Sequence, residues 1–349
     1  MKIQTFNINN LIRENIKQLK PYASARSEFS DIDDSMTYLD ANENPFETGL
    51  NRYPDPQHRN VKKVLAQQKE VKIENILLGN GSDEVLDLIF RAFCEPAKDN
   101  FITLPPTYGM YSVLGNINNI ENRKVLLNTD FQPDVDTILA TANKNTKLLF
   151  ICSPNNPTGN SISAKYIEQL LNSFTGIIVI DEAYIDFSSQ KSWISKLEKY
   201  PNLIVTQTLS KAYGMAGIRL GICYASNQII AVLNKIKPPY NVNKLTQQKA
   251  LERIIKNNKL KEEIDLITVE KNKLLKELLK INYIVKIYPS ETNFILIKVD
   301  DANLRYQQLL KKGIVVRNRT TQPRCKNCLR ITIGTKEENQ QLIQILKKL

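Results

Sequence analysis

The sequence predicts an α/β protein in which a mostly parallel β-sheet is sandwiched by helices and is followed by a smaller α+β unit. Two observations support this prediction. Between about residues 75 and 225, short continuous apolar runs alternate with amphipathic stretches, and strands that are covered on both faces need such continuous hydrophobicity. The chain has 349 residues, of which 42% are hydrophobic and 24% charged, so it can bury a large core without a disulfide or metal staple.

Six apolar runs are predicted to be strands of the large sheet: 75–78, 100–103, 147–152, 176–181, 202–206 and 218–223. Amphipathic helices are expected between them, for example at 82–93 and 163–174, each opening with a capping serine. A long helical pattern covers 244–279. The remainder predicts a strand at 293–299, a helix, strands at 313–316 and 328–333, and a last helix.

The charge pattern gives little support for a nucleic-acid-binding protein. The net charge is +12, and basic surfaces attract phosphate. However, lysine is spread along the whole chain, and its densest stretch alternates with glutamate at helical spacing, as on a solvated helix face. No zinc-finger, RNP or basic-zipper pattern occurs. We therefore expect no nucleic-acid partner, and a phosphorylated small molecule would explain some of the positive charge.

The cysteine content predicts a reduced, cytoplasmic chain without a metal site. The five cysteines are an odd number, which argues against a disulfide framework. Cys325 and Cys328 have C-x-x-C spacing, but no second pair follows, and the single histidine, His58, is far away in the sequence. No run of about eighteen apolar residues and no apolar N-terminal segment occurs, so we expect neither a membrane span nor a secretory signal.

The first strand is followed by a candidate phosphate site. Ligands of open parallel sheets bind at the carboxyl ends of the strands, where Gly79 and Gly81 here precede a predicted helix. Position 84 is Glu, so the third glycine of a dinucleotide fingerprint is missing, as is the lysine of a P-loop. Glycines before a helix leave backbone N–H groups free for an anion, so either a single phosphate site or a simple tight turn fits this motif.

Three later strand ends also carry polar motifs. They are the turn-dense segment 153–159, the segment Asp181-Glu-Ala-Tyr184, and the segment Thr208-Leu-Ser-Lys211 with Arg219 eight residues after the lysine. Each of them alone is explained by a turn or a surface charge. All three in this order, each at a strand end, indicate a cofactor site.

With these motifs the chain resembles the histidinol-phosphate aminotransferases, a family of fold-type-I enzymes that depend on pyridoxal 5'-phosphate. The resemblance covers nearly the whole chain and includes the segments 21–22, 25–26, 40–45, 52–54, 105–108, 153–159, 181–184, 209–211, 217–219 and 329–335. It implies a seven-stranded large sheet. It also implies an N-terminal arm at 1–39, a large cofactor-binding domain at 40–243, a connecting helix at 244–282 and a small domain at 283–349.

The resemblance assigns roles around the cofactor. Lys211 would bind the cofactor aldehyde and move a proton on the substrate, which requires an amine whose pKa is lowered by burial and nearby positive charge. Asp181 would keep the ring nitrogen protonated. Asn156 and Tyr184 would bind the phenolic oxygen, and Tyr108 would stack on the ring. The cofactor phosphate would be held by Ser82, Asp83, Thr208, Ser210 and Arg219, and by Tyr53 reaching over from a partner subunit, which implies a homodimer with shared sites.

The substrate site is likewise implied by resemblance. Arg317 and Arg330, thirteen residues apart, match two family arginines that grip the acidic group of the substrate, and a guanidinium fork suits phosphate or carboxylate. Tyr22 and Asn44 would line the pocket. The implied reaction converts histidinol phosphate and 2-oxoglutarate to imidazole-acetol phosphate and glutamate. The residues Lys-Asn-Cys before Leu329 depart from the Gly or Ser that is frequent in the family.

Three alternatives stay open at this point. A threonine-phosphate decarboxylase and a broad aromatic aminotransferase share the fold, the lysine and the aspartate. A transcription regulator with this fold would carry a DNA-binding domain ahead of the core, but only about forty residues precede the segment 40–45. We therefore expect an aminotransferase rather than a regulator.

Overall fold

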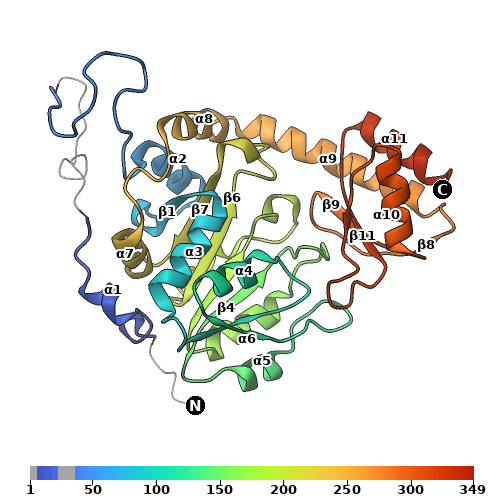
Figure 1. The fold of residues 1–349 in the computed structure, drawn as a ribbon, viewed down its shortest axis with the longest axis horizontal. Helices are drawn as coiled ribbons and strands as arrows, with labels where there is room; N and C mark the ends of the chain where they lie inside the picture. Colours follow the sequence, from blue (N-terminus) through green and yellow to red (C-terminus); the bar gives the residue numbers. More distant parts are fainter. Residues whose placement is uncertain (1–5, 23–35) are drawn as a thin grey trace.

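The computed structural model describes residues 6–22 and 36–349, and within them a seven-stranded sheet forms the centre of the larger part of the chain (Figure 1). The strand order is β1-β7-β6-β5-β4-β2-β3. Strand β7 is antiparallel to β1 and β6, and the other neighbours are parallel. The strands are β1 (Ile76–Asn80), β2 (Asn100–Thr103), β3 (Glu121–Lys124), β4 (Thr146–Cys152), β5 (Ile177–Asp181), β6 (Leu203–Thr208) and β7 (Leu220–Ala225).

The six strands predicted from apolar runs are confirmed, and so is the mostly parallel sheet. Strand β3 was not predicted, because its sequence, Glu-Asn-Arg-Lys, is entirely polar. Such a strand is possible only because β3 lies at the edge of the sheet, beside β2 alone, where charged side chains also protect an open edge.

Helices cover both faces of this sheet. They are α1 (Glu14–Gln18), α2 (Arg59–Lys69), α3 (Gly81–Phe93), α4 (Met110–Ile117), α5 (Val135–Thr141), α6 (Ala164–Ser173), α7 (Asn227–Ile236) and α8 (Lys244–Ile254). Short 3₁₀ helices occur at Ile8–Asn10, Ile73–Asn75, Ile185–Phe187, Trp193–Lys196 and Ala216–Ile218. Along β5, Ile178 and Ile180 pack into the core shared with α2, α5, α6 and α8, whereas Ile177 and Val179 pack into the core shared with α3, α4 and α7. Burial on both faces is the reason for the continuous apolar runs.

Of the two predicted serine caps, the one at Ser82 is wrong and the one at Ser163 is confirmed in position only. The N-cap of α3 is Asn80, and Ser82 lies inside the first turn; Ser163 is the N-cap of α6, but its side chain makes no capping hydrogen bond. At α3 the start is set by glycines: Gly81 has a φ of 78°, and a Cβ on Gly221 would lie 2.3 Å from the Gly81 carbonyl carbon and the Ser82 nitrogen. Only glycine permits this close approach.

The helix predicted over 244–279 is divided in two, α8 (Lys244–Ile254) and α9 (Asn257–Leu278). Both helices contact the core of the large sheet, where Leu260 of α9 is also buried, but only α9 continues onto the small sheet. Ala250 and Ile254 of α8 are buried in the core of the large sheet, whereas Leu274 and Leu278 of α9 are buried in the core of the small sheet. The chain thus passes from one packed unit to the other along α9 (Figure 1).

The C-terminal part is an antiparallel sheet of order β10-β11-β9-β8 within the described residues, with helices on one face. The elements are β8 (Ile284–Ile287), β9 (Phe294–Val299), α10 (Ala302–Lys311), β10 (Arg317–Asn318), β11 (Cys328–Thr332) and α11 (Lys336–Leu346). The short strand β8 was not predicted. The strand predicted at 313–316 is wrong, because Gly313, at φ 79°, ends the turn after α10 and the chain joins β11 only at Arg317.

The two faces of the small sheet differ. Ile295, Leu329 and Ile331 point into the core covered by α9, α10 and α11. The opposite face carries Leu296 and Cys328, which are buried together with Cys325. Residue alternation places Arg330 on this second face, and its side chain contacts the large domain.

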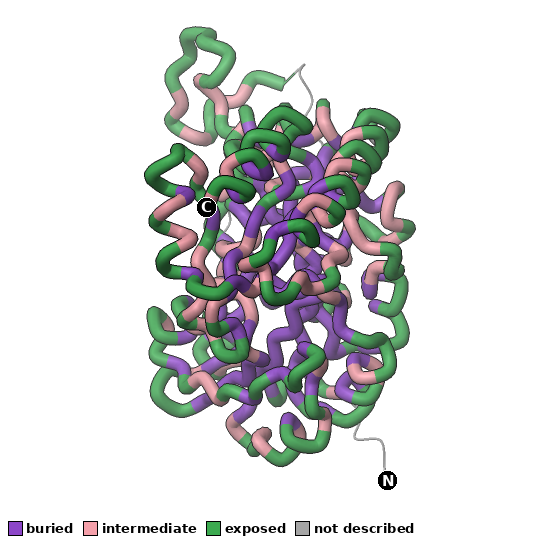
Figure 2. Tube along the Cα trace, turned by 90° about the vertical axis from the view of Figure 1, so that its right-hand side faces the viewer, coloured by how far each residue is buried: buried purple, intermediate pink, exposed green. Residues whose placement is uncertain are grey.

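The N-terminal region runs along the outside of the large domain. The backbone N–H of Arg13, just before α1, donates to the carbonyl of Ala92 at 3.1 Å. Residues 36–53 form a largely exposed loop that projects from the body (Figures 1 and 2). In this loop Leu39 is 90% and Phe46 77% exposed. None of the helices in the described part of the chain is long and apolar enough to cross a membrane.

Candidate active site

The turn after β6 places Lys211 at the carboxyl edge of the large sheet. Its Nζ lies 5.8 Å from the centre of the Tyr184 ring, which follows β5. Burial lowers the pKa of the Lys211 amine, the positive charge of Arg330 lowers it further, and the carboxylate of Asp181 opposes the shift. The predicted environment of a nucleophilic amine is therefore present around Lys211.

Asp181, the last residue of β5, is buried and held by two hydrogen bonds. The hydroxyl of Tyr111 donates to Oδ2 at 2.7 Å, and the backbone N–H of Ala183 donates to Oδ1 at 3.1 Å. Burial raises the pKa of Asp181, and these hydrogen bonds oppose the increase. No cation of the described residues forms an ion pair with this carboxylate. A cationic ring nitrogen would provide the counter-charge that the buried carboxylate lacks.

Tyr111 was not predicted as a site residue. It is completely buried on α4 and stacks on Phe150 with ring centroids 4.8 Å apart. The available signal was a second tyrosine three residues after Tyr108, but a buried aromatic residue near the start of a helix is equally typical of a core position. Only the contact with Asp181 distinguishes it.

Tyr111→Phe is expected to lower the free energy of unfolding of the cofactor-free protein by about 1.5–3 kcal/mol at pH 8, the usual value of a hydrogen bond to a charged group. Burial raises the pKa of Asp181, and the substitution raises it further. The loss should therefore be smallest below this pKa, where the carboxyl is neutral, and grow as the pH rises through it. Urea unfolding at pH 5 and pH 8 measures the difference. Tyr224→Phe is the matched control, because the buried Tyr224 hydroxyl has no hydrogen-bond partner among the described residues; equal losses in both variants would contradict the prediction.

The first turn of α3 provides the backbone of the predicted phosphate site. Ser82 and Asp83 are its second and third residues, and the N-cap Asn80 makes no side-chain capping hydrogen bond. The amide of Gly81 is already bonded to the carbonyl of Arg219 at 3.0 Å. The next N–H groups therefore remain available at the positive end of a thirteen-residue helix.

Hydroxyl and guanidinium groups gather beside this helix end. The Thr208 hydroxyl lies 3.0 Å from that of Ser210, which is 3.5 Å from Nη1 of Arg219. Nη2 of Arg219 lies 3.7 Å from Oδ2 of Asp83, and a Cβ on Gly81 would lie 2.5 Å from the same Nη2. The five side chains or amides predicted to hold the cofactor phosphate are thus brought together, with donors suited to an anion.

Tyr108, Asn156 and Tyr184 surround the same space. The hydroxyl of Tyr108 donates to Oδ1 of Asp83 at 3.1 Å. Oδ1 of Asn156 accepts a 2.6 Å hydrogen bond from Nη1 of Arg330. Tyr184 is buried, and burial raises the pKa of its hydroxyl, whereas the charge of Arg330 lowers it.

The two predicted substrate arginines lie on neighbouring strands. Arg317 of β10 is directly opposite Arg330 of β11 in the register. Arg330 is partly buried over the ring of Phe294, 5.0 Å from its centre, and its Nε is buried without a hydrogen-bond partner in the described chain. Arg317 is exposed. Both burial and the charge of Arg317 lower the pKa of Arg330, as expected for guanidinium groups gathered without an anion.

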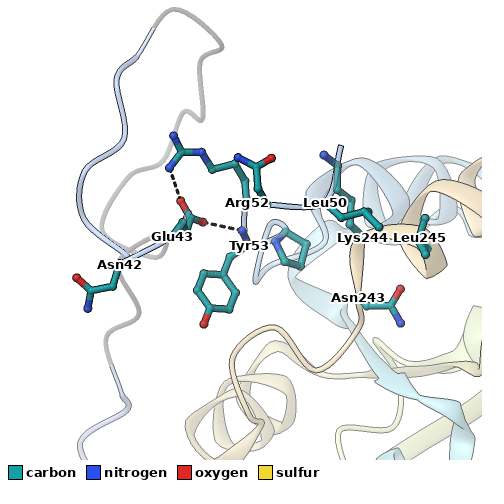
Figure 3. Close-up of a pocket in the computed structure, with 10 residues that line it drawn as sticks. Asn42, Glu43, Leu50, Arg52, Tyr53, Asn243, Lys244 and Leu245 are labelled. Atoms are coloured by element: carbon teal, nitrogen blue, oxygen red, sulfur yellow. Dashed lines mark hydrogen bonds and ion pairs between the residues drawn. The ribbon is translucent and has the colours of Figure 1, made fainter. Parts of the chain in front are cut away.

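Three predicted residues lie in the segment before α2 and are not brought to Lys211 within one chain. Tyr22 is 77% exposed, and Asn44 is exposed with its Oδ1 accepting from the amide of Phe46. Tyr53 is 52% exposed and stacks on Tyr240 at 4.5 Å. Tyr53 lines an open pocket of about 460 Å³ between the segment before α2 and the start of α8. Figure 3 shows the side chains around this pocket. No residue of the Lys211 site lines this pocket.

Comparison with known proteins decides the family. Residues 39–346 match the family described as aminotransferase class I and II. The chain is 64% identical to the histidinol-phosphate aminotransferase of Flavobacterium johnsoniae, over 99% of this chain and 100% of that protein. It is 50% identical to that of Bacteroides fragilis strain YCH46, over 98% and 99%. The chain belongs to the histidinol-phosphate aminotransferases. The predicted family and enzyme class are therefore confirmed.

Solved structures agree with this family in fold. A histidinol-phosphate aminotransferase from Clostridium acetobutylicum has a TM-score of 0.79 at 24% identity, over 86% of this chain and 91% of that chain. The enzyme from Sinorhizobium meliloti, in complex with pyridoxal-5'-phosphate, has a TM-score of 0.78 at 23% identity, over 85% and 82%. These similarities confirm the predicted fold class of the aminotransferase.

The chemistry of the site fits pyridoxal phosphate. A buried carboxylate without a cation, an amine of lowered pKa and a helix start with uncapped N–H groups match the ring nitrogen, aldehyde and phosphate of that group. Among the described residues, no group of three or more His, Cys, Asp or Glu side chains is arranged to hold a metal ion.

Proposed function

We propose that this aminotransferase moves the amino group of histidinol phosphate to 2-oxoglutarate, forming imidazole-acetol phosphate and glutamate, with pyridoxal 5'-phosphate as cofactor. The observation that carries the proposal is the hydrogen bond of Arg330 to Asn156, 2.6 Å long. It brings a guanidinium of the small domain to the cofactor site of the large domain, where the acidic end of a substrate would lie. The similarity to curated histidinol-phosphate aminotransferases supports the same substrate.

Each group around Lys211 has a task in this reaction. Bound pyridoxal phosphate supplies a ring that withdraws electrons from the substrate carbon that loses its proton. Lys211, with its lowered pKa, would bind the cofactor and then accept and return that proton. Asp181 would hold the proton on the ring nitrogen, with Tyr111 fixing the carboxylate. Asn156 and Tyr184 would bind the phenolic oxygen, and Tyr108 would cover the ring.

The phosphate groups are held by two separate sets of donors. For the cofactor these are the first amides of α3 with Thr208, Ser210 and Arg219. For the substrate they are Arg317, which is exposed, and Arg330, which as an arginine remains charged although it is partly buried. The separation allows the enzyme to keep its cofactor while the substrate and product exchange.

The enzyme is proposed to act in the cytoplasm as a homodimer. Exposed large side chains in the segment before α2 support a partner subunit. Tyr22 and Phe46 are each 77% exposed, and large apolar groups that gather on one segment are normally covered. A partner would also explain why Tyr22, Asn44 and Tyr53 lie apart from Lys211 of their own chain. The free, buried cysteines suit a reducing compartment.

A shared site predicts recovery of activity in mixed dimers. Lys211→Ala and Tyr53→Ala homodimers should each be nearly inactive. Hybrids should regain activity, because one of their two sites would contain neither substitution. Co-expression with two affinity tags isolates the hybrids for the glutamate assay. Isolated hybrids that stay as inactive as the parents would contradict the contribution of Tyr53 across the interface.

A substrate panel tests the proposed reaction. One preparation should be assayed with histidinol phosphate, histidinol, phenylalanine and threonine phosphate, with 2-oxoglutarate as acceptor. We expect glutamate to form fastest with histidinol phosphate. Faster release of carbon dioxide from threonine phosphate would favour the decarboxylase alternative, and faster glutamate formation from phenylalanine would favour the aromatic aminotransferase.

A further inference from the structure

We infer that Arg319 is a third arginine of the substrate-anion site and favours a phosphate over a carboxylate. The inference rests on the proposed function and adds a residue that the sequence analysis did not single out. Arg319 follows β10 directly, two residues after Arg317.

The backbone places Arg319 on the same face as the other two arginines. Its N–H donates to the carbonyl of Cys328 at 2.8 Å, which extends the β10–β11 pairing one residue beyond Asn318 and Leu329. Side chains two residues apart on a strand point to the same face. Arg317 and Arg319 therefore share the face that carries Arg330, opposite the helices and toward Asn156 of the large domain.

The side chain of Arg319 is partly buried without a protein partner. Its Nε is buried and has no hydrogen-bond partner, and its guanidinium forms no ion pair among the described residues. Arg330 differs in that one of its nitrogens is satisfied by Asn156. A guanidinium N–H that is removed from water without an acceptor is unfavourable, so the position of Arg319 is best explained by an anion that enters the site.

Charge supports this explanation. Burial lowers the pKa of Arg319 to about 10, and the next causes are the positive charges of Arg330 and Arg317. The positive charge of Arg317 also lowers the pKa of Arg330. Three like charges on one sheet face repel each other, and a ligand with two negative charges and several acceptor oxygens relieves this repulsion better than a carboxylate with one.

The chemistry of the substrate gives Arg319 a specific task. Histidinol phosphate offers a phosphate dianion, whereas 2-oxoglutarate, the amino acceptor of the second half of the reaction, offers only carboxylates. A guanidinium that adds donors beyond those of Arg317 and Arg330 would therefore strengthen the binding of histidinol phosphate more than that of 2-oxoglutarate. Arg319 is in this sense a specificity-determining residue.

Arg319→Gln in the cofactor-loaded enzyme tests the inference. We expect KM for histidinol phosphate to rise about 10- to 100-fold, the range for a lost hydrogen bond to a charged group. The kcat/KM for unphosphorylated histidinol and KM for 2-oxoglutarate should change by less than about threefold. Arg319→Lys should recover part of the loss, because lysine retains the charge without the fork. Arg324→Gln is the matched control, since Arg324 is an exposed arginine of the same loop.

A binding measurement separates this inference from the proposed reaction. Titration calorimetry with methyl phosphate, which has no amine, should show a dissociation constant that rises about 10-fold or more in Arg319→Gln and not in Arg324→Gln. If wild type does not convert histidinol phosphate, the proposed function fails, and methyl phosphate still reports on Arg319. Unchanged KM and methyl phosphate binding in Arg319→Gln would overturn the role of Arg319. Equal losses for histidinol and histidinol phosphate, or the same losses in Arg324→Gln, would also overturn it.

Discussion

Lys211→Ala is expected to reduce the rate of transamination by at least about 10⁴-fold, the largest effect of any single substitution in this chain. The substitution removes both the amine that binds the cofactor and the group that moves the substrate proton, and proton transfer alone contributes about 10²- to 10⁴-fold. The lowered pKa of Lys211 and its position 5.8 Å from the centre of the Tyr184 ring support both tasks. Glutamate formation from histidinol phosphate and 2-oxoglutarate measures the loss.

The control for this prediction is Lys191→Ala, because Lys191 is an exposed lysine outside the site and should retain full activity. Borohydride reduction of the wild type followed by peptide mass spectrometry provides an independent result. The pyridoxyl label should be found on the peptide that contains Lys211. A label on a different lysine would show that the assignment is wrong.

Arg330→Ala is expected to lower kcat/KM for histidinol phosphate by roughly 30- to 4,000-fold. Removing one partner of a desolvated, hydrogen-bonded charge pair costs on the order of 2–5 kcal/mol, and each factor of ten corresponds to about 1.4 kcal/mol. Arg330 is partly buried, and it links the small sheet to Asn156, so the substitution removes both a charge and a contact between the domains. Lysine should restore only part of the activity, because it lacks the planar fork.

Comparison of two substrates shows whether the loss concerns the phosphate. Wild type should use histidinol poorly, and Arg330→Ala should discriminate much less between histidinol and histidinol phosphate. Arg324→Ala, at an exposed position of the loop between β10 and β11, should behave as wild type. If Arg330→Ala retains the full preference for the phosphorylated substrate, Arg330 does not bind the phosphate.

The parts of the fold that the sequence predicted correctly are those with a strong local pattern. The apolar run that became β5 needs burial on both faces wherever it is placed, and it forms a strand at the centre of the sheet. The errors occur where the pattern is weak or ambiguous. The polar strand β3 depends on its neighbour β2, and apolar residues at 313–316 cannot indicate that the turn at Gly313 delays pairing until Arg317.

The same distinction holds for the candidate site. Asp181 is the last residue of β5 and Lys211 follows β6, and these neighbouring strands are parallel. The topology therefore directs both residues to the same edge of the sheet, where the charge of Asp181 acts on Lys211. Ser82 and Asp83 were predicted beside a glycine turn and lie at the start of α3. Only the resemblance indicates that Tyr53 reaches the active site of a partner subunit. Tyr53 is 52% exposed, and its contact with a partner stays a prediction.

The sequence by itself determined the central strands and the order of polar motifs at their ends, because burial periodicity and turn residues are local properties. The family was indicated by the resemblance of these motifs to those of known enzymes. Only the tertiary structure decided which distant side chains meet. The hydrogen bonds of Tyr111 to Asp181 and of Arg330 to Asn156 join residues 70 and 174 positions apart, and the position of Arg319 depends on the pairing of β10 with β11. Such contacts follow from how helices pack on the large sheet, how the strands of the small sheet pair and where the small sheet lies beside the large domain, and this packing is the sum of many weak interactions that no single segment encodes.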